Sequence, residues 1–336
     1  MSTSAPGVRP VAAYTDRDDV DVTAGAALLR DNGFDVRYLD TQDPAAIRKG
    51  AADAAALLVG YAHIDADLIG SLPNLRIIAL MSMGYNNIDL DAARRRGIWV
   101  TNIPGAATEE VAAHTLALTL ALTRDLAFYL DAARNGRWNS RNEAPPVRLS
   151  CKRLGLIGLG RIGQRFGALA RHTFADVVGY DPLLAETPEA AAALRSAGIR
   201  RTGFDEVLET SDVVSLHVPL TEATDKLINQ ASLRRMRPGS YLVNVSRGQL
   251  LDVPAVVDAL DSARLAGVAV DVLEEEPPPA AHPLLTHPRA LVTPHVAYLS
   301  DVTEAEYVRQ QAQNVLSWRR DGAPDAPLFP LERVQA

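Results

Sequence analysis

Three short segments in the second half of the sequence carry side chains suited to proton transfer and to anion binding. They read N-V-S-R-G at 244–248, D-V-L-E-E-E-P at 271–277 and T-P-H at 293–295. An imidazole titrates near neutral pH and can protonate an oxygen that gains negative charge, and a neighbouring carboxylate stabilises and orients the imidazolium. The planar fork of an arginine fits a carboxylate, and its charge polarises a carbonyl. His295 and Arg247 therefore suit the chemistry of a keto acid.

Taken singly, each segment also has an ordinary structural explanation. An arginine after a strand is usually a surface ion-pair partner, an acidic run is usually a solvated loop, and a Pro-His pair is often a turn. Their shared position favours the functional interpretation, because each follows an apolar run of strand type. In doubly wound sheets, ligands bind outside the carboxyl ends of the strands.

A glycine pattern precedes these segments. Gly158, Gly160 and Gly163 have G-x-G-x-x-G spacing, after an apolar run at 153–157 and before a helical pattern. In that context the first glycine permits a tight turn, the second lets the backbone approach a pyrophosphate, and the third lets helix and strand pack closely. The helix N-terminus then offers N–H groups to the phosphates. The pattern predicts a dinucleotide site, and the alternative is a glycine-rich turn beside a surface aspartate.

The acid expected on the adenosine ribose is Asp181. It follows the apolar run 176–180, at about the 20-residue offset typical of this fold. The next residues, 182–184, include no Arg or Lys that would accept a 2′-phosphate. The sequence therefore predicts NAD as the cofactor in preference to NADP.

Apolar runs and helical patterns alternate along most of the chain, which indicates βαβ units and parallel sheets. We expect strands at 11–14, 36–39, 55–59, 77–80, 98–100, 153–157, 176–180, 213–218, 241–245, 267–272 and 291–293. We expect helices at 24–32, 45–52, 65–72, 90–96, about 108–135, 161–171, 188–197, 253–260 and about 300–320.

The bulk composition excludes several classes of protein. The 336 residues carry a formal net charge of -7 with no Lys/Arg stripe, so we expect no nucleic-acid partner. No run reaches the length of a membrane-spanning helix, and the first ten residues lack an apolar signal-peptide stretch. The lone Cys151 cannot form an intrachain disulfide, and no residue grouping has metal-ligand spacing. We expect a soluble cytoplasmic protein without a metal.

Together, the motifs resemble those of the D-isomer-specific 2-hydroxyacid dehydrogenases, in the same order. The resemblance covers about 11–331 and includes the glycine fingerprint, Y-D-P at 180–182, H-V-P-L-T at 217–221 and the three segments above. It implies an NAD-dependent oxidoreductase that acts on the CH–OH group of a small 2-hydroxy acid, or on a 2-keto acid in reverse. The M-S-x-G loop at 81–84 is close to that of glyoxylate/hydroxypyruvate reductases, so we expect a substrate of that kind.

The resemblance implies a role for each site residue. Arg247 binds the substrate carboxylate and carbonyl, His295 is the acid/base, and Glu276, the acid just before proline, is its partner. The main-chain N–H groups of Met83 and Gly84 take the substrate carboxylate. The implied substrate pocket also contains Tyr298, and the implied cofactor contacts are Gly158, Gly160, Arg161, Ile162, Gly163, Asp181, Val218, Pro219, Thr224, Val245 and Asp271.

The resemblance also implies the architecture. The α/β chain forms two doubly wound parallel-sheet lobes, with a Rossmann NAD-binding domain at 105–299 inserted in a flavodoxin-like substrate/catalytic domain at 1–104 plus 300–336. A homodimer is implied as well. The sequence departs from many members at two places, since Leu80 and Met81 stand where an Arg is common and Ala113 where a Glu is common.

Two other functions remain open at this point. The first is a cofactor-sensing binding protein, because some relatives are transcriptional corepressors and the D-P-L-L turn at 181–184 and Tyr298 are reminiscent of them. The second is a dehydrogenase of formate or phosphite, although formate enzymes pair the histidine with Gln and phosphite enzymes use a Lys near the substrate loop.

Three further histidines have weaker claims to a function. His217 follows a predicted strand and could approach the cofactor, but we interpret it as a structural residue. His282 and His287 lie in a Pro-rich stretch, where we expect solvated side chains.

Overall fold

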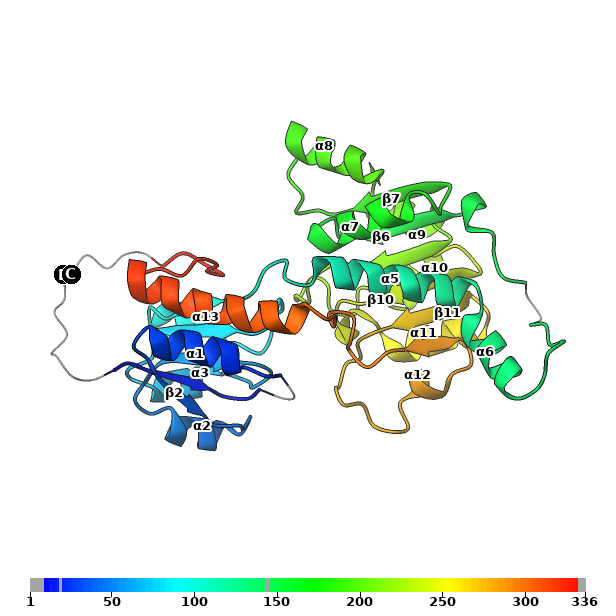
Figure 1. The fold of residues 1–336 in the computed structure, drawn as a ribbon. Coiled ribbons are helices and arrows are strands. Elements are labelled where there is room, and N and C mark those ends of the chain that lie inside the picture. Colours follow the sequence, from blue (N-terminus) through cyan, green and yellow to red (C-terminus); the bar gives the residue numbers. More distant parts are fainter. Residues whose placement is uncertain (1–8, 18–19, 143–144, 332–336) are drawn as a thin grey trace. The chain divides into compact units, whose positions relative to one another are not determined.

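The computed structural model describes residues 9–17, 20–142 and 145–331 (Figure 1). The chain divides into two compact units. Unit 1 comprises Met1–Ala106 and Ser300–Ala336, and unit 2 comprises Ala107–Leu299. We propose that they are the substrate/catalytic domain and the NAD-binding domain. The outer ends of the expected first domain, 1–8 and 332–336, lie outside the described residues.

Unit 1 contains one parallel sheet in its described part, with the strand order β2-β1-β3-β4-β5. This is the flavodoxin-like order. Central strands such as β3 and β4 consist of consecutive apolar residues, and all of these except Ala55 are buried, as expected when helices cover both faces. The strands are β1 (Val11–Tyr14), β2 (Asp35–Tyr38), β3 (Ala54–Val59), β4 (Ile77–Leu80) and β5 (Trp99–Thr101).

The helices of unit 1 come from both ends of the chain. The last helix, α13, packs against α1 and against β4, and α1 and α13 lie side by side in Figure 1. The buried Gln311 of α13 donates to the carbonyl oxygen of Ala79 at 2.9 Å. The helices are α1 (Thr23–Asp31), α2 (Pro44–Gly50), α3 (Ala66–Ser71), α4 (Leu90–Arg95) and α13 (Thr303–Asp321).

Unit 2 contains a larger parallel sheet in its described part, in the order β12-β11-β10-β9-β6-β7-β8. Counted from β6, this is the Rossmann order with one added strand at the β12 edge. The predicted fold class is therefore confirmed for both sheets. The strands are β6 (Arg153–Ile157), β7 (Asp176–Tyr180), β8 (Arg200–Arg201), β9 (Val213–Leu216), β10 (Ser240–Asn244), β11 (Leu265–Val270) and β12 (Ala290–Val292).

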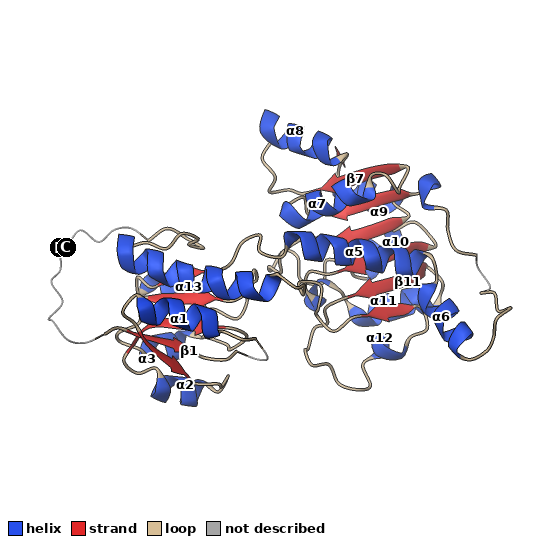
Figure 2. Cartoon of the chain, in the orientation of Figure 1, coloured by secondary structure: helices blue, strands red, loops and turns tan. Residues whose placement is uncertain are grey.

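Helices flank this sheet (Figure 2). The helix α5 packs on α7, β10 and β11. The helix α8 is capped at its N-terminus by Thr187, whose side chain accepts the N–H of Ala190, and at its C-terminus by Gly198, which has the left-handed conformation. The helices are α5 (Thr108–Thr123), α6 (Leu126–Arg134), η1 (Leu149–Cys151), α7 (Arg161–Ala170), α8 (Pro188–Ala197), α9 (Phe204–Thr210), α10 (Gln230–Arg235), η2 (Gly248–Leu250), α11 (Val253–Asp261) and α12 (Pro283–Thr286).

The single helix expected at about 108–135 is wrong. The structure breaks it into α5 and α6, because Asp125 between them has a left-handed backbone with φ of 52°. In the last turns of α5, the hydroxyls of Thr119 and Thr123 bond to carbonyls four residues back, a pattern that bends helices. Within the described residues, no single helix is long and apolar enough to cross a membrane. The helices α5 and α6, which are bent by 66° relative to each other, are together long and apolar enough to cross a membrane by length and composition alone.

Candidate functional site

His295 and Glu276 form a hydrogen-bonded pair. Nδ1 of His295 lies 2.5 Å from Oε2 of Glu276, and the other carboxylate oxygen accepts the N–H of Leu273 at 2.9 Å. The two residues follow β12 and β11, which are neighbouring parallel strands, so their carboxyl ends bring the side chains together. Each side chain is 34% exposed, which leaves the pair accessible to a small molecule.

Glu276 carries a negative charge near neutral pH. Burial by itself raises the pKa of its carboxyl group. The hydrogen bond and charge of His295, the N–H of Leu273 and the charge of Arg247 outweigh that effect, so the pKa lies below its ordinary value. An ionised carboxylate on Nδ1 keeps a proton there, so Nε2 is the nitrogen that can exchange a proton with a substrate.

Arg247 follows β10, and its guanidinium donates to the carbonyl of Ser246 at 2.6 Å. The side chain of Asn244 accepts the N–H of Ser246 and donates to the carbonyl of Arg247, which fixes the turn. A Cβ on Gly248 would lie 1.9 Å from the carbonyl carbon of Leu273. The glycine after Arg247 therefore lets this turn touch the segment that leads to Glu276.

Asp271 holds the loop that carries His295. Its carboxylate, 1% exposed, accepts the hydroxyl of Thr293 at 2.5 Å and the N–H groups of Val296 and Ala297. Its main-chain carbonyl accepts the N–H of His295 at 2.8 Å. His295 itself has φ of 53°, a conformation that a non-glycine residue adopts when its surroundings impose it. The expected cofactor contact of Asp271 stays a prediction.

No pattern in the sequence indicates that His114 contacts the T-P-H segment. Nε2 of His114, on α5, lies 3.1 Å from the hydroxyl of Thr293 and 3.6 Å from a carboxylate oxygen of Asp271. Only the folded chain shows this link, because 179 positions separate His114 from Thr293. Tyr298 lies in the same loop, with its ring centre 6.4 Å from that of His295.

The glycine fingerprint forms a tight turn between β6 and α7. Gly158 has φ of 99°, and a Cβ there would lie 2.3 Å from the carbonyl oxygen of His217. A Cβ on Gly163 would lie 2.2 Å from the carbonyl oxygen of Gly158. A Cβ on Gly160 would meet nothing within 4 Å. The open space at Gly160, beside the N-terminus of α7, fits the pyrophosphate of a dinucleotide.

Asp181 lies against this turn. Its carboxylate accepts the N–H of Leu159 at 2.9 Å and the N–H of Leu183 at 2.9 Å. The acid thus stands at the end of β7, beside the glycine turn at the end of β6. This placement fits a ribose whose hydroxyls bind the carboxylate.

The other expected cofactor residues lie after the carboxyl ends of strands or at the start of α7. Val218 and Pro219 follow β9, and the hydroxyl of Thr224 donates to the carbonyl of Pro219 at 2.6 Å. Val245 follows β10 directly, and Arg161 and Ile162 begin α7. The fold therefore brings these positions to the same edge of the unit 2 sheet.

The substrate loop expected in unit 1 follows β4. The side-chain amide of Asn102 donates to the carbonyl of Met83 at 2.7 Å, and the hydroxyl of Ser82 donates to the carbonyl of Gly84 at 2.7 Å. Asn314 of α13 supports Asn102 by donating to its carbonyl at 3.0 Å. These bonds fix the two peptide groups on either side of Gly84.

A second set of bonds holds the neighbouring loop after β3. The buried carboxylate of Asp16 accepts the N–H groups of Gly60, Tyr61 and Ala62. The side chain of Asn87, at the end of the substrate loop, donates to the carbonyl of Ala62 at 3.0 Å. The loops after β3 and β4 are therefore joined by side chains that the sequence argument did not single out.

The structure places the three weaker histidines in structural roles. Burial lowers the pKa of His217 to about 3, and its ring packs on Phe166 and bonds to the hydroxyl of Ser215. The expectation that His282 and His287 are solvated is wrong. His282 is 6% exposed and accepts the N–H of Leu284 at the start of α12, and the side chain of His287 is 11% exposed and meets Asp261.

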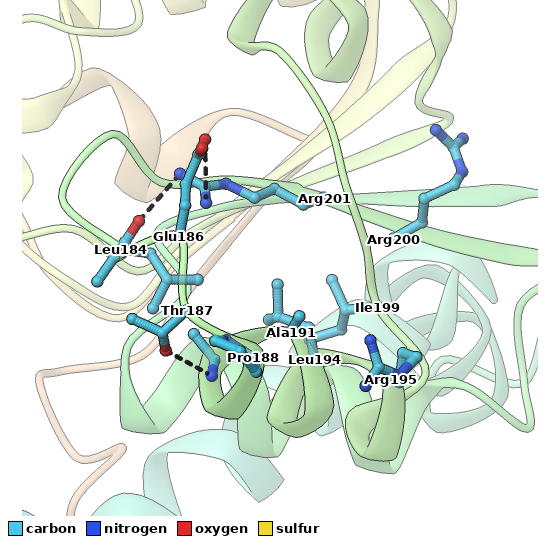
Figure 3. A pocket seen from close by; sticks show the side chains of 12 residues that line it. Leu184, Glu186, Thr187, Pro188, Ala191, Leu194, Arg195, Ile199, Arg200 and Arg201 are labelled. Carbon is cyan, nitrogen blue, oxygen red and sulfur yellow. Dashed lines mark hydrogen bonds and ion pairs between the residues drawn. The ribbon is translucent and has the colours of Figure 1, made fainter.

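Unit 2 also contains a cavity of about 640 Å³ between α8 and the turn after β7. Apolar side chains such as Leu194 and Ile199 line it together with Arg195, Arg200 and Arg201 (Figure 3). The cavity lies on the α8 side of the Asp181 turn. Within the described residues, no group of three or more His, Cys, Asp or Glu side chains could hold a metal ion.

Comparison with known proteins accounts for this arrangement. The family model of the D-isomer specific 2-hydroxyacid dehydrogenase, NAD binding domain, matches residues 116–297. The glyoxylate reductase of Korarchaeum cryptofilum is 36% identical over 265 residues, which cover 78% of each chain. The solved structure of a glyoxylate reductase from Paecilomyes thermophila has a TM-score of 0.87 and 27% identity, and covers 95% of this chain and 98% of that one.

A third similar protein was solved with its ligands. The D-lactate dehydrogenase of Aquifex aeolicus, in complex with NAD and lactic acid, has a TM-score of 0.83 and 27% identity and covers 95% of this chain and 99% of that one. The chain belongs to the D-isomer specific 2-hydroxyacid dehydrogenases. It is an NAD-dependent oxidoreductase that acts on the CH–OH group of small 2-hydroxy acids or, in reverse, on 2-keto acids. The predicted family, reaction type and cofactor are confirmed.

Proposed function

We propose that the protein reduces a small 2-keto acid, such as glyoxylate or hydroxypyruvate, to the 2-hydroxy acid with NADH. The observation that carries the proposal is the His295–Glu276 pair, 2.5 Å apart and within the electrostatic influence of Arg247. The names of similar proteins support the substrate class, because they include glyoxylate reductases and a hydroxypyruvate reductase.

His295 is the proposed acid in the reduction. NADH, when bound, supplies a hydride to the keto carbon, and the carbonyl oxygen then gains negative charge. Nε2 of His295 donates its proton to that oxygen. Before this transfer, the carboxylate of Glu276 stabilises the positive charge of the protonated imidazole ring. In the reverse direction the same nitrogen takes the proton from the hydroxyl.

Arg247 is the proposed ligand of the substrate carboxylate and carbonyl. Its charge polarises the C=O bond, and its planar fork matches a carboxylate. In unit 1, the N–H groups of Met83 and Gly84 are proposed carboxylate donors. The chain has Leu80 and Met81 where many members have an arginine. Binding of the substrate carboxylate in unit 1 therefore depends more on main-chain N–H groups. We place Tyr298 beside the substrate side chain.

NAD is held by the glycine turn and Asp181. The open space beside Gly160 admits the pyrophosphate, and the N–H groups at the start of α7 face it. Asp181 takes the adenosine ribose hydroxyls. Arg161, Ile162, Val218, Pro219, Thr224, Val245 and Asp271 complete the proposed cofactor contacts.

The decisive experiment measures NADH oxidation by the purified protein with glyoxylate, hydroxypyruvate, pyruvate, phenylpyruvate and branched 2-keto acids. We expect the highest kcat/KM with glyoxylate or hydroxypyruvate. A preference for phenylpyruvate or the branched acids would contradict the proposed substrate, and the reaction type would stand.

We further propose that the protein is a homodimer, with α6 in the interface. Leu126 and Leu130 on this helix are 47% and 46% exposed, and Trp138 beyond it is 86% exposed. Such a group of apolar side chains favours burial against a second copy. Light scattering should give twice the chain mass, and Leu130→Asp with Trp138→Ser should give the single mass. A wild-type protein of single mass at micromolar concentration would contradict this.

We also propose a cytoplasmic location. A single exposed cysteine, Cys151, suits a reducing compartment. Fractionation of cells that express the protein with an epitope tag would test it, and recovery of the tag outside the cytoplasmic fraction would contradict it.

A further inference from the structure

The turn after β7 contacts an arginine, Arg201, that does not belong to the turn itself. Residues 182–184, which follow Asp181, include no basic residue. The next strand, β8, pairs Arg201 with Gly179 of β7, so the Arg201 side chain can reach the turn. Its Nη2 donates to the carbonyl of Asp181 at 3.1 Å and to that of Leu184 at 3.0 Å. Figure 3 shows this reach towards Leu184 and Glu186.

The acid opposite Arg201 is only loosely held. Oε1 of Glu186 lies 3.7 Å from Nη1 of Arg201, and the Glu186 side chain is 90% exposed. An exposed pair at this distance is strongly screened by water and salt. The carboxylate of Asp181, in contrast, is held by two main-chain N–H groups. A second anion can therefore displace Glu186 from Arg201 at little cost.

The neighbouring Arg200 provides a contrast. Its guanidinium contacts Glu206 at 3.1 Å and Asp176 at 3.2 Å. Arg200 and Arg201 lie well apart in Figure 3. Of these two arginines, Arg201 is the one that donates a hydrogen bond to Asp181, the residue that bears the proposed ribose carboxylate.

We propose that Arg201 is a second determinant of cofactor choice: it binds the 2′-phosphate of NADP, and Glu186 competes with that phosphate. This rests on the proposed contact between Asp181 and the adenosine ribose. The 2′-phosphate is attached at the ribose hydroxyl that Asp181 would bind, and Arg201 bonds to the main chain of that same residue. The planar guanidinium matches a phosphate.

Two opposing effects then set the cofactor preference. Asp181 repels the phosphate by its like charge, and Glu186 occupies Arg201, so NAD is preferred. Arg201 supplies an attraction that keeps NADP as a weaker, salt-sensitive ligand. Replacement of Asp181 should expose that attraction.

The test compares two nucleotides that differ only in the presence of a 2′-phosphate. Titration calorimetry on the full-length protein measures Kd for adenosine 2′,5′-bisphosphate and for adenosine 5′-monophosphate, first in the Asp181→Ser variant. Adding Arg201→Gln should raise the Kd of the bisphosphate about tenfold, since a hydrogen bond to a charged group is lost, and should leave the monophosphate within about twofold. Adding Glu186→Gln should lower the Kd of the bisphosphate about two- to threefold.

Arg200→Gln in the same Asp181→Ser background is the matched control. It removes the same charge from the adjacent position and should leave the Kd ratio of the two nucleotides unchanged. Equal effects of Arg200→Gln and Arg201→Gln on that ratio would overturn the proposal. So would an Arg201→Gln variant that weakens both nucleotides alike, because Arg201 would then only support the turn.

The role of Asp181 and the role of Arg201 can be tested independently. An Asp181→Ser variant with an unchanged ratio of NAD to NADP affinity would contradict the ribose contact. The comparison of Arg201→Gln with Arg200→Gln in the wild-type background would still decide whether Arg201 binds the 2′-phosphate.

Discussion

The side-chain amide of Asn102 donates a hydrogen bond to the carbonyl of Met83, over 2.7 Å. That carbonyl and the N–H of Gly84 belong to one planar trans peptide group, so the two bonds point in opposite directions. Asn102 therefore aims the N–H that we propose for the substrate carboxylate. The N–H of Gly84 points away from Asn102 because the Asn102 side chain holds the carbonyl of the same peptide group.

Asn102→Ala should release this peptide and weaken binding of the keto acid. We expect KM for glyoxylate to rise about tenfold, the equivalent of about 1.4 kcal/mol, with KM for NADH unchanged. Steady-state kinetics with each substrate varied in turn would measure both constants. Asn32→Ala, at the exposed end of α1, is the control, because the side chain of Asn32 also donates to a main-chain carbonyl, that of Leu28. An equal rise in both KM values would contradict a specific role in the substrate loop.

His295→Gln should abolish turnover, because glutamine cannot transfer a proton at neutral pH. The expected loss in kcat is about 10²–10⁴-fold. Fluorescence titration should show NADH binding within about twofold of wild type, because the proposed role of the imidazole is proton transfer. A variant that retained half of the wild-type rate would show that the acid had been assigned wrongly.

Glu276→Gln should change the pH profile. The carboxylate orients the ring and stabilises its protonated form, so its loss should lower kcat/KM for reduction and change how that constant depends on pH. The pKa of Glu276 itself lies below the ordinary 4.5. The carboxylate therefore stays ionised from neutral pH down to that value, and its protonation should not reduce wild-type activity in this interval. A variant with the wild-type profile would contradict the pairing.

His217 should make the protein less stable in acid. Its native pKa is about 3 and its unfolded value is 6.5, so between these values the unfolded chain binds a proton that the native chain does not. From this group, the free energy of unfolding should rise with pH by up to about 1.4 kcal/mol per unit in that window and stay level above it. Urea unfolding at pH 5 and pH 7 would show a smaller difference for His217→Gln.

His63→Gln is the matched control for that experiment, because His63 is exposed. It should retain the wild-type difference between pH 5 and pH 7. An identical difference for His217→Gln and the wild type would mean that the pKa of His217 is the same in the native and the unfolded protein.

Periodicity and motif order were enough to predict both sheets, because buried parallel strands are continuous apolar runs and a glycine fingerprint has a fixed place between strand and helix. The pairing of Glu276 with His295 was implied by the family resemblance, and both residues stand after strands whose carboxyl ends meet at one edge. The structure adds their 2.5 Å contact.

The supporting residues could not be predicted in the same way. Asn102, Asp16 and His114 act through hydrogen bonds to the main chain or to distant side chains, and such bonds leave no period in the sequence. Arg201 could not be predicted from the residues that follow Asp181, because a neighbouring strand supplies this cation. The break at Asp125 depends on one left-handed residue in an apolar stretch with a helical pattern.

The discontinuous course of unit 1 has a consequence for its synthesis. Its first five strands leave the ribosome early, but α13, which packs on α1 and β4 and bonds to Ala79 through Gln311, is translated only after residue 300. Unit 2 is continuous and can complete its core first. The apolar surface of unit 1 that α13 covers therefore stays exposed in the nascent chain while nearly 200 residues, from Ala107 to Leu299, are translated. This interval is the one in which we expect the nascent chain to depend most on chaperones.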